Sequence, residues 1–302
     1  MRGADAPNRY RRMMAEELKR CDVCAGLELD KLDAKTALCG CRRCGFVFRN
    51  PRPSFEEIAA FYSANDHYDA WLAVEKARDL LWQRRLAKVR RERTTGTLLD
   101  VGTGIAQFLF FARRDFEIEG TEVSPVAIHI AKERYGIGIL QGRIEDIDFG
   151  NRQFELITLF HVLEHVASPS STLARCRDLL APNGIIIVAV PNELESWRRV
   201  VKGALRRVSF GRFRNYGAYG LLPLQLDDSA QEIHLSHFTP RVLRLLLERT
   251  QLRVVREGLD PYYVATGVPK VVKDGLYYFF SAVHRILGVN WYETVWMVAA
   301  KQ

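Results

Sequence analysis

The chain has 302 residues, of which 48% are hydrophobic and 26% are charged, and this balance excludes a disordered or fibrous protein. No run approaches the roughly 20 apolar residues of a membrane-spanning helix, and the first twenty residues lack the apolar core of a signal peptide. We therefore expect a cytoplasmic protein, with any membrane contact peripheral at the inner face of the membrane. The net charge of +8 permits an anionic partner but does not identify one.

The N-terminal part of the chain carries a helical pattern over residues 8–20 and then a dense group of cysteines. Cys21, Cys24, Cys41 and Cys44 form two C-x-x-C knuckles. This spacing predicts a tetrahedral site in which four thiolates hold a structural zinc ion. The ion would stabilise a segment too small to have a hydrophobic core of its own, and Cys39 is an extra cysteine that could compete as a ligand.

A proline-rich break at residues 50–53 separates this segment from a helical region. Ser54 is placed to cap a helix, with Glu57 at the capping-box position. Residues 70–93 repeat apolar side chains at helical spacing among many arginines and lysines. We predict an N-terminal helix and zinc-binding segment at 1–53 and a helical linker or lid at 54–93.

From residue 94 onward, strand-like and helix-like patterns alternate. The predicted strands are Thr97–Val101, Glu117–Glu122, Gly138–Gln141, Phe154–Phe160, Gly184–Val190, Leu252–Leu259 and Thr294–Ala300. Helical patterns between them include Pro125–Arg134, Ser171–Leu180 and Pro240–Thr250. Strands separated by helices predict an α/β fold, in which a doubly wound, mostly parallel, seven-stranded sheet fills residues 94–302.

The loop after the first of these strands predicts the cofactor. Asp100, Gly102 and Gly104 lie in a tight turn, but Gln107 stands where a dinucleotide-binding fingerprint needs its third glycine. The carboxylate of Asp100 would repel a pyrophosphate and suits an amino group. Glu122 ends the next strand, where ribose hydroxyls are bound in such sheets. A ribose joined to an amino acid describes S-adenosylmethionine.

With these motifs, residues 94–302 resemble the class I S-adenosylmethionine-dependent methyltransferases. The resemblance implies a Rossmann-like, seven-stranded sheet whose last strand, here Thr294–Ala300, is antiparallel. Ala106 replaces a glycine common in that family and is expected to crowd the methionine part slightly without abolishing binding. The implied cofactor-binding residues are Asp100, Gly102, Thr103, Gly104, Glu122, Val123, Ile144, Glu145 and Phe160.

A cluster of three polar residues follows the strand that begins at Phe154. On a helix, His161 and His165 would share a face with Glu164 beside them. The string also fits the metalloprotease pattern H-x-x-E-H. Pro169 follows closely and the segment is the exit of a sheet strand, which argues against a protease. Histidines that only satisfy backbone hydrogen bonds remain the simpler alternative.

The Glu164-His165 pair resembles a Glu-His pair found at this place in methyltransferases that act on sugars, quinones and RNA ends. There it supplies a general base or part of a magnesium site. The magnesium version usually has a glutamate where this chain has His161, which argues against magnesium. We expect His165 to be the base, aided by Glu164, with His161 as the second candidate. His234 and His237 are expected either to contact substrate or to face solvent.

The second cysteine knuckle and the residues after it, Gly45-Phe46-Val47-Phe48, resemble the N-terminal segment of bacterial sugar and glycan methyltransferases. We therefore predict methyl transfer to a hydroxyl or carbon of a nucleotide-linked or lipid-linked sugar in polysaccharide biosynthesis. An RNA methyltransferase and a non-catalytic cofactor-binding scaffold are the alternatives. No RNA motif or stacking platform is present, so we do not expect a nucleic-acid partner.

A basic insertion, residues 191–239, is predicted to form a lid over the site. Residues 197–214 carry seven arginines and lysines and no acid. Such a stretch could lie on an anionic membrane, bind acceptor phosphates, or form a lid helix with a solvated basic face. The aromatic run at residues 277–280 is expected to line a substrate wall or a homodimer interface rather than to anchor a membrane.

Overall fold

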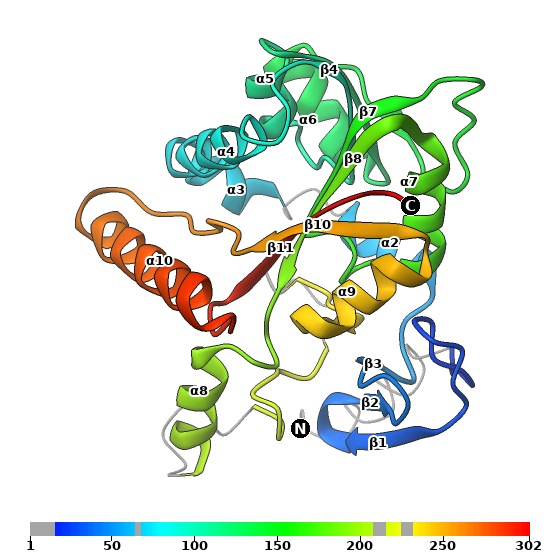
Figure 1. Cartoon of the computed structure of the whole chain (residues 1–302), viewed down its shortest axis with the longest axis vertical. Helices are drawn as coiled ribbons and strands as arrows, with labels where there is room; N and C mark the ends of the chain where they lie inside the picture. The colour runs from blue at the N-terminus through cyan, green and yellow to red at the C-terminus, as the bar shows by residue number, and fades with distance from the viewer. Residues whose placement is uncertain (1–15, 64–67, 208–215, 225–231) are drawn as a thin grey trace, which may run out of the picture.

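A computed structural model describes residues 16–63, 68–207, 216–224 and 232–302, and it confirms the predicted α/β fold (Figure 1). Seven strands form one sheet in the order β10-β11-β8-β7-β4-β5-β6. The strands are β4 (Gly96–Val101), β5 (Phe116–Glu122), β6 (Leu140–Gln141), β7 (Phe154–Phe160), β8 (Leu180–Pro191), β10 (Leu252–Gly258) and β11 (Thr294–Lys301). Strand β11 is antiparallel to both of its neighbours, and the other strand pairs are parallel.

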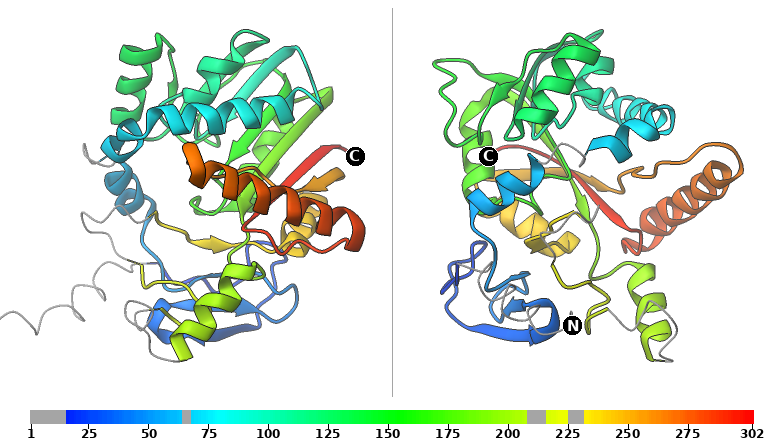
Figure 2. Two further views of the ribbon diagram at one scale, coloured as in Figure 1. Left: turned by 90° about the vertical axis from the view of Figure 1, so that its left-hand side faces the viewer. Right: turned by 180° about the vertical axis from the view of Figure 1, so that it is seen from behind.

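Helices cover both faces of this sheet, because alternate side chains of each strand point to opposite faces. On one face, Leu98 of β4 and Trp296 of β11 share a core with the helices α4 (Glu75–Val89), α5 (Gln107–Ala112) and α6 (Pro125–Tyr135). On the other face, Leu99 and Met297 share a core with α7 (Pro169–Leu179) and α9 (Pro240–Arg249). Figure 2 shows these layers from two further sides.

The helices begin at the residues that the sequence marks. Helix α2 (Phe55–Tyr62) starts at the predicted capping box, in which Ser54 and Glu57 each bind the other's backbone N–H. Helices α6, α7 and α9 begin with a proline that follows a serine or threonine cap. A hydroxyl cap followed by proline satisfies or removes N–H groups that lack a partner in the first turn.

The cysteine segment belongs to a second, four-stranded antiparallel sheet that the sequence patterns did not predict. Its order is β1-β2-β3-β9. The strands are β1 (Leu29–Asp33), β2 (Leu38–Cys41), β3 (Val47–Arg49) and β9 (Ser236–His237), with a short 3-10 helix, η1 (Ala34–Thr36), after β1. Strand β9 comes from the basic insertion, so two parts of the chain far apart in sequence share this sheet.

Some predicted helices differ in the structure. A helix is expected over residues 8–20, but residues 1–15 lie outside the described part of the chain. Glu16, the first described residue, pairs with Arg52 in an antiparallel bridge. The helix expected over residues 70–93 is interrupted at Val74, which separates α3 (Asp69–Ala73) from α4. Two further helices are α8 (Trp197–Arg207) and α10 (Gly267–Leu287). Within the described residues, no helix has the length and apolar character needed to span a membrane.

Candidate active site

A cavity of about 420 Å³ opens at the carboxyl ends of β4, β5 and β7. The chain reverses its direction of winding at β4, and ligands bind at this point in open α/β sheets. Eight of the nine predicted cofactor-binding residues line the cavity: Gly102, Thr103, Gly104, Glu122, Val123, Ile144, Glu145 and Phe160. The predicted cofactor loop and the cavity therefore coincide.

The glycine loop is held against the end of β5 by Glu122. The Gly104 N–H donates to Glu122 Oε2 at 2.8 Å, and the N–H groups of Val123 and Ser124 donate to Oε1 at 2.8 and 2.9 Å. Burial raises the pKa of Glu122, although these three N–H groups oppose the rise. Gly102 has φ +65°, and a Cβ there would lie 2.8 Å from Val162 Cγ2, so this position needs glycine.

Two other residues of the predicted cofactor motif are not among the residues that line the cavity. Asp100 is buried and accepts a hydrogen bond from Thr158 Oγ1 at 2.6 Å, and burial raises its pKa to about 7. Its contact with the cofactor's amino group stays a prediction. Ala106 adopts the left-handed conformation, with φ +62°, and is fully buried, so the structure does not show the expected crowding of the cavity.

The histidine cluster is built on a turn and not on the helix that its spacing suggested. Strand β7 ends at Phe160, His161 has φ +59°, and the His165 N–H donates to Val162 O at 2.9 Å. This turn puts both histidines on the cavity wall. Glu164 is fully buried between them, with its Oε1 3.2 Å from His161 Nδ1 and 3.8 Å from His165 Nε2.

The surroundings of His165 indicate which of its nitrogens carries the proton. Its Nδ1 lies 2.6 Å from the carbonyl oxygen of Ile233 and 2.8 Å from the hydroxyl of Tyr62, which can either donate or accept. Because a carbonyl oxygen only accepts, we place the proton of the neutral ring on Nδ1, which leaves the lone pair on Nε2. Burial lowers the pKa of His165, and the positive charge of His234 lowers it further, although Glu164 opposes both. His165 therefore favours the neutral ring, and it is one of the residues that line the cavity.

His161 has a different environment. Its Nε2 lies 3.2 Å from Asp260 Oδ2, and its ring stacks on Tyr262 with the centroids 4.2 Å apart. Burial alone would lower the pKa of His161, but Asp260 and Glu164 outweigh it and raise the pKa above its ordinary value. Asp260 is itself buried and paired with Arg85 Nε at 2.9 Å. His161 thus favours the charged form, so His165 is the better candidate for the base.

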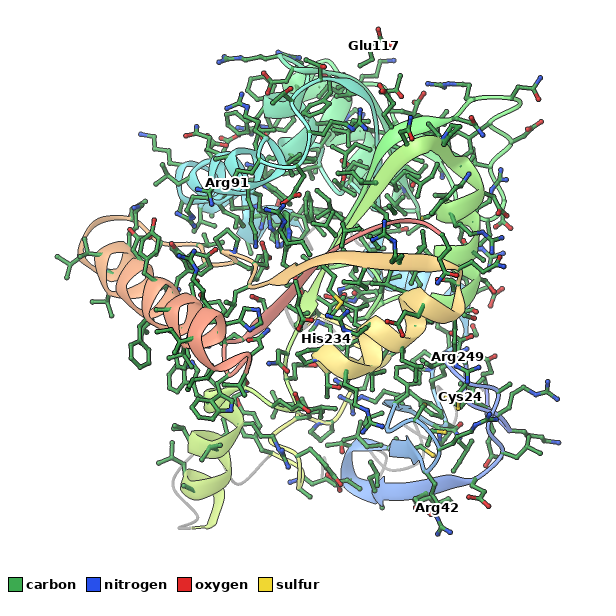
Figure 3. The ribbon with its side chains drawn as sticks, viewed as in Figure 1. Cys24, Arg42, Arg91, Glu117, His234 and Arg249 are labelled. Atoms are coloured by element: carbon green, nitrogen blue, oxygen red, sulfur yellow. The ribbon has the colours of Figure 1, made fainter. Side chains whose placement is uncertain are left out.

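The structure keeps His234 and His237, the predicted substrate contacts, off the residues that line the cavity. Both bind Glu193, at 3.2 and 2.6 Å. Figure 3 labels His234 near the centre of the molecule. The centroids of the His234 and His165 rings are 4.9 Å apart. Glu232, which the sequence patterns missed, does line the cavity.

Glu164, His165 and His234 each offer one ligand atom within 4.8 Å of the others, which makes the set a candidate metal site. Two of the three donors are imidazole nitrogens. Magnesium prefers an octahedral set of oxygens, so these residues do not fit it.

Arg78 of α4 is a further cation on the cavity wall that the sequence patterns missed. Its Nε donates to Gln107 Oε1 at 2.8 Å, at the start of α5, and its guanidinium lies 3.9 Å from the Trp71 ring centroid. It is 4% exposed and forms no ion pair within the described residues. A buried guanidinium that has no carboxylate partner among the described residues suits an anionic ligand group beside the glycine loop.

The four predicted zinc ligands converge in the N-terminal sheet, where Figure 3 labels Cys24. The Sγ atoms of Cys21 and Cys44, and those of Cys24 and Cys41, are 3.5 Å apart, and all four lie within 4.8 Å of one another. Tetrahedral zinc–thiolate bonds place sulfur atoms about 3.8 Å apart, so the set fits zinc. Cys39 is buried in β2 and does not belong to the set.

A short segment, residues 233–237, joins the cysteine sheet to the histidine turn. The Arg49 N–H of β3 donates to Leu235 O at 2.8 Å. The Leu235 N–H in turn donates to the backbone oxygen of Glu164 at 2.7 Å. Ile233, at the start of this segment, is the residue that binds His165 Nδ1.

Known protein structures share this fold. A methyltransferase from Thermotoga maritima that depends on S-adenosylmethionine superposes with a TM-score of 0.51 at 16% identity, over 82% of this chain and all of that one. A chain in the complex of the Haloferax volcanii Trm112 methyltransferase activator with a methyltransferase gives a TM-score of 0.50 at 18% identity, over 79% of this chain and 97% of that one. These likenesses show the shared fold.

Two curated relatives are ubiquinone biosynthesis O-methyltransferases. The one from Pasteurella multocida is 44% identical over 55 residues, which is 18% of this chain and 23% of the relative. The one from Rhodopseudomonas palustris is 31% identical over 107 residues, or 33% of this chain and 41% of the relative. The chain thus spans less than half the length of either relative.

A sequence profile described as a methyltransferase domain matches residues 71–257, which include the glycine loop, the histidine turn and Arg78. The chain belongs to this methyltransferase domain family, and its residues 71–257 form an S-adenosylmethionine-dependent methyltransferase domain.

Proposed function

We propose that the protein methylates a hydroxyl oxygen on an aromatic ring, with His165 as the general base. The observation that carries this proposal is that His165, whose pKa burial lowers, lines the same cavity as the glycine loop. S-adenosylmethionine supplies a methyl group that its sulfonium already activates. The chain then has to align the acceptor oxygen and remove its proton, and His165 takes that proton as the bond from oxygen to carbon forms.

The basicity of His165 favours a phenol over a sugar. A phenol has a pKa of about 10, whereas an alcohol resembles water, with a pKa of about 15.7. Because burial lowers the pKa of His165, the ring is a weak base. It is better matched to the more acidic phenolic hydroxyl, since proton transfer is efficient when the two pKa values are not far apart.

The shape of the cavity and the relatives support the same class of acceptor. The walls include six aromatic rings suited to a flat acceptor: Tyr62, Tyr68, Trp71, Trp82, Phe160 and Tyr262. The curated relatives named above are O-methyltransferases of ubiquinone biosynthesis. None of these observations supports the sugar acceptor expected from the cysteine segment, and we do not retain polysaccharide biosynthesis as the function.

The acceptor class is tested by incubating the protein with methyl-labelled S-adenosylmethionine and a panel of acceptors. Protocatechuate and its octyl ester provide ring hydroxyls, and a nucleotide-linked glucose provides sugar hydroxyls. We expect label in the two catechols and none in the sugar. The dimethyl ether of protocatechuate has no free ring hydroxyl and is the matched control. Methylation of the sugar with no label in either catechol would contradict the proposal.

We also propose that Arg78 binds the carboxylate of the methionine part of the cofactor. Replacing Arg78 with methionine (R78M) keeps a long chain over Trp71 but removes the charge. We expect the dissociation constant for S-adenosylmethionine to rise by about tenfold to a hundredfold, the usual worth of a hydrogen bond to a charged group. Titration calorimetry measures this change.

Methylthioadenosine, which lacks the amino acid part, separates this role from a general loss of the site. R78M should leave the affinity for methylthioadenosine nearly unchanged. The exposed Arg91, labelled in Figure 3, provides the control variant R91M, for which neither affinity should change. If R78M lost affinity equally for S-adenosylmethionine and for methylthioadenosine, Arg78 would instead support the fold of the glycine loop.

A further inference from the structure

Helix α10 turns its apolar side to solvent. Most of its exposed apolar residues are separated by three, four or seven positions, so they share one face of the helix and form a stripe along it. The stripe consists of Val268, Val271, Val272, Leu276, Phe279 and Ile286, and Val268 and Ile286 are 76% and 78% exposed. A helix at the surface of a globular protein normally buries such a stripe.

The opposite side of α10 faces the protein through both polar and aromatic contacts, which hold the helix in this orientation. Asp274 binds Lys270 Nζ at 2.6 Å and also accepts a hydrogen bond from Tyr263, in the loop before the helix. On the same side, Tyr277 contributes to a buried cluster, and Phe280 stacks on Trp197 of α8 with the centroids 6.3 Å apart. Rolling the helix to bury its stripe would break these contacts.

Helix α8 extends this surface. It lies next to the end of α10, where the Trp197 N–H donates to Trp291 O at 2.9 Å, and Trp291 is 52% exposed. Val200 and Val201 of α8 are exposed as well, at 73% and 44%. Figure 2, left, shows both helices on the side of the molecule that faces the viewer.

The two helices that carry this apolar surface are rich in basic residues. Residues 197–207 contain five arginines and lysines and no acid, and α10 contains three against one aspartate. By sequence the two helices carry a formal charge of +7, from eight cations and one acid, although Arg198 pairs with Glu293 and Lys270 with Asp274. A second copy of this chain would bring like charges together across the interface, whereas anionic lipid headgroups complement them.

We infer that α8 and α10 dock the protein on an anionic membrane surface, with the stripe of α10 buried at the boundary between headgroups and acyl chains. An amphipathic helix with a basic rim binds membranes in this manner without crossing them. The loop before α10 includes Asp260 and Tyr262 of the active site. Docking would therefore place the membrane close to the cavity wall. This inference does not depend on the proposed acceptor.

Co-sedimentation with vesicles tests the inference. The zinc-loaded 302-residue chain is expected to bind vesicles that contain phosphatidylglycerol more tightly than vesicles of phosphatidylcholine alone, and the binding should weaken as salt is added. The double variant V272D/F279D places two charges in the centre of the stripe and should lower the partition coefficient at least about tenfold. The control L27D changes an exposed leucine, 71% accessible, outside the two helices and should bind like wild type.

A second measurement uses the protein without charged substitutions. Brominated lipids quench tryptophans that enter the membrane, so they should quench wild-type fluorescence, and W291F should lose part of that quenching. Binding of S-adenosylmethionine, measured in parallel, should be the same in all variants. Equal binding to both kinds of vesicle, or unchanged binding by V272D/F279D, overturns the inference. A stable wild-type dimer that the V272D/F279D substitutions dissociate also overturns the inference, because the stripe would then be the interface between two copies of the chain.

Discussion

Replacing His165 with alanine is expected to lower the turnover number by between about 10² and 10⁴-fold, the usual contribution of a general base. The affinity for S-adenosylmethionine should stay close to that of wild type, because the ring contributes nothing to the glycine loop. Initial rates at saturating cofactor and acceptor, together with titration calorimetry, measure the two quantities. H129A is the matched control, since His129 is exposed on α6.

The variant H165N distinguishes a base from a residue that only positions others. An asparagine amide can donate to the Ile233 carbonyl in place of Nδ1, but it has no counterpart of the basic Nε2. H165N should therefore be as slow as H165A, and a return of most of the turnover would remove His165 from the base role. In wild type, turnover should fall as pH drops through the pKa of His165, below the ordinary histidine value, because protonation removes the lone pair. The pH–rate profile of H165N should lack this decrease at low pH.

Replacing Cys24 or Cys44 with serine is expected to abolish zinc binding and to lower the melting temperature on the order of 10 °C. The cysteine sheet is built from short strands, and the metal would supply much of the energy that folds it. Burial raises the pKa of Cys44 to about 11 and that of Cys21 still further, so a cation is needed to keep these thiols ionised. Elemental analysis and scanning calorimetry measure the metal content and the transition.

C39S is the control for this experiment. Cys39 is a neighbouring buried cysteine outside the four-sulfur set, so C39S should keep one zinc ion per chain. Its own loss of stability should be smaller than that of C24S. If C24S retained zinc, or if C39S lost it, the assignment of the four ligands would be wrong.

The large sheet was predictable from sequence and the small one was not, for physical reasons. Strand β7 was predicted with its observed bounds, because a buried parallel strand is a continuous apolar run. Strands β3 and β9 have three and two residues, too few to show the alternation that marks a strand. Their pairing depends on residues nearly two hundred positions apart, which no local pattern reveals.

In the active site, residues on the strand ends could be predicted, and residues contributed by packing could not. The glycine loop and the histidine turn follow strands directly, and Asp260 follows β10 in the same manner, so attention to that strand end would have found it. Arg78 lies on a helix rich in arginines, and only the packing of α4 selects the one that faces the cavity. The tautomer of His165 depends on a carbonyl 68 residues away.

The segment at residues 233–237 links the cysteine site to the active site. It is tied on one side to β3 of the cysteine sheet and on the other to the turn that holds Glu164 and His165. Any free energy that zinc contributes to ordering the sheet therefore also favours the conformation in which His165 can accept a proton. By linkage, the coupling is reciprocal, so a ligand that orders the histidine turn would raise the affinity of the four cysteines for zinc. An ion bound by the four cysteines would then favour catalysis from a distance, without contacting either substrate.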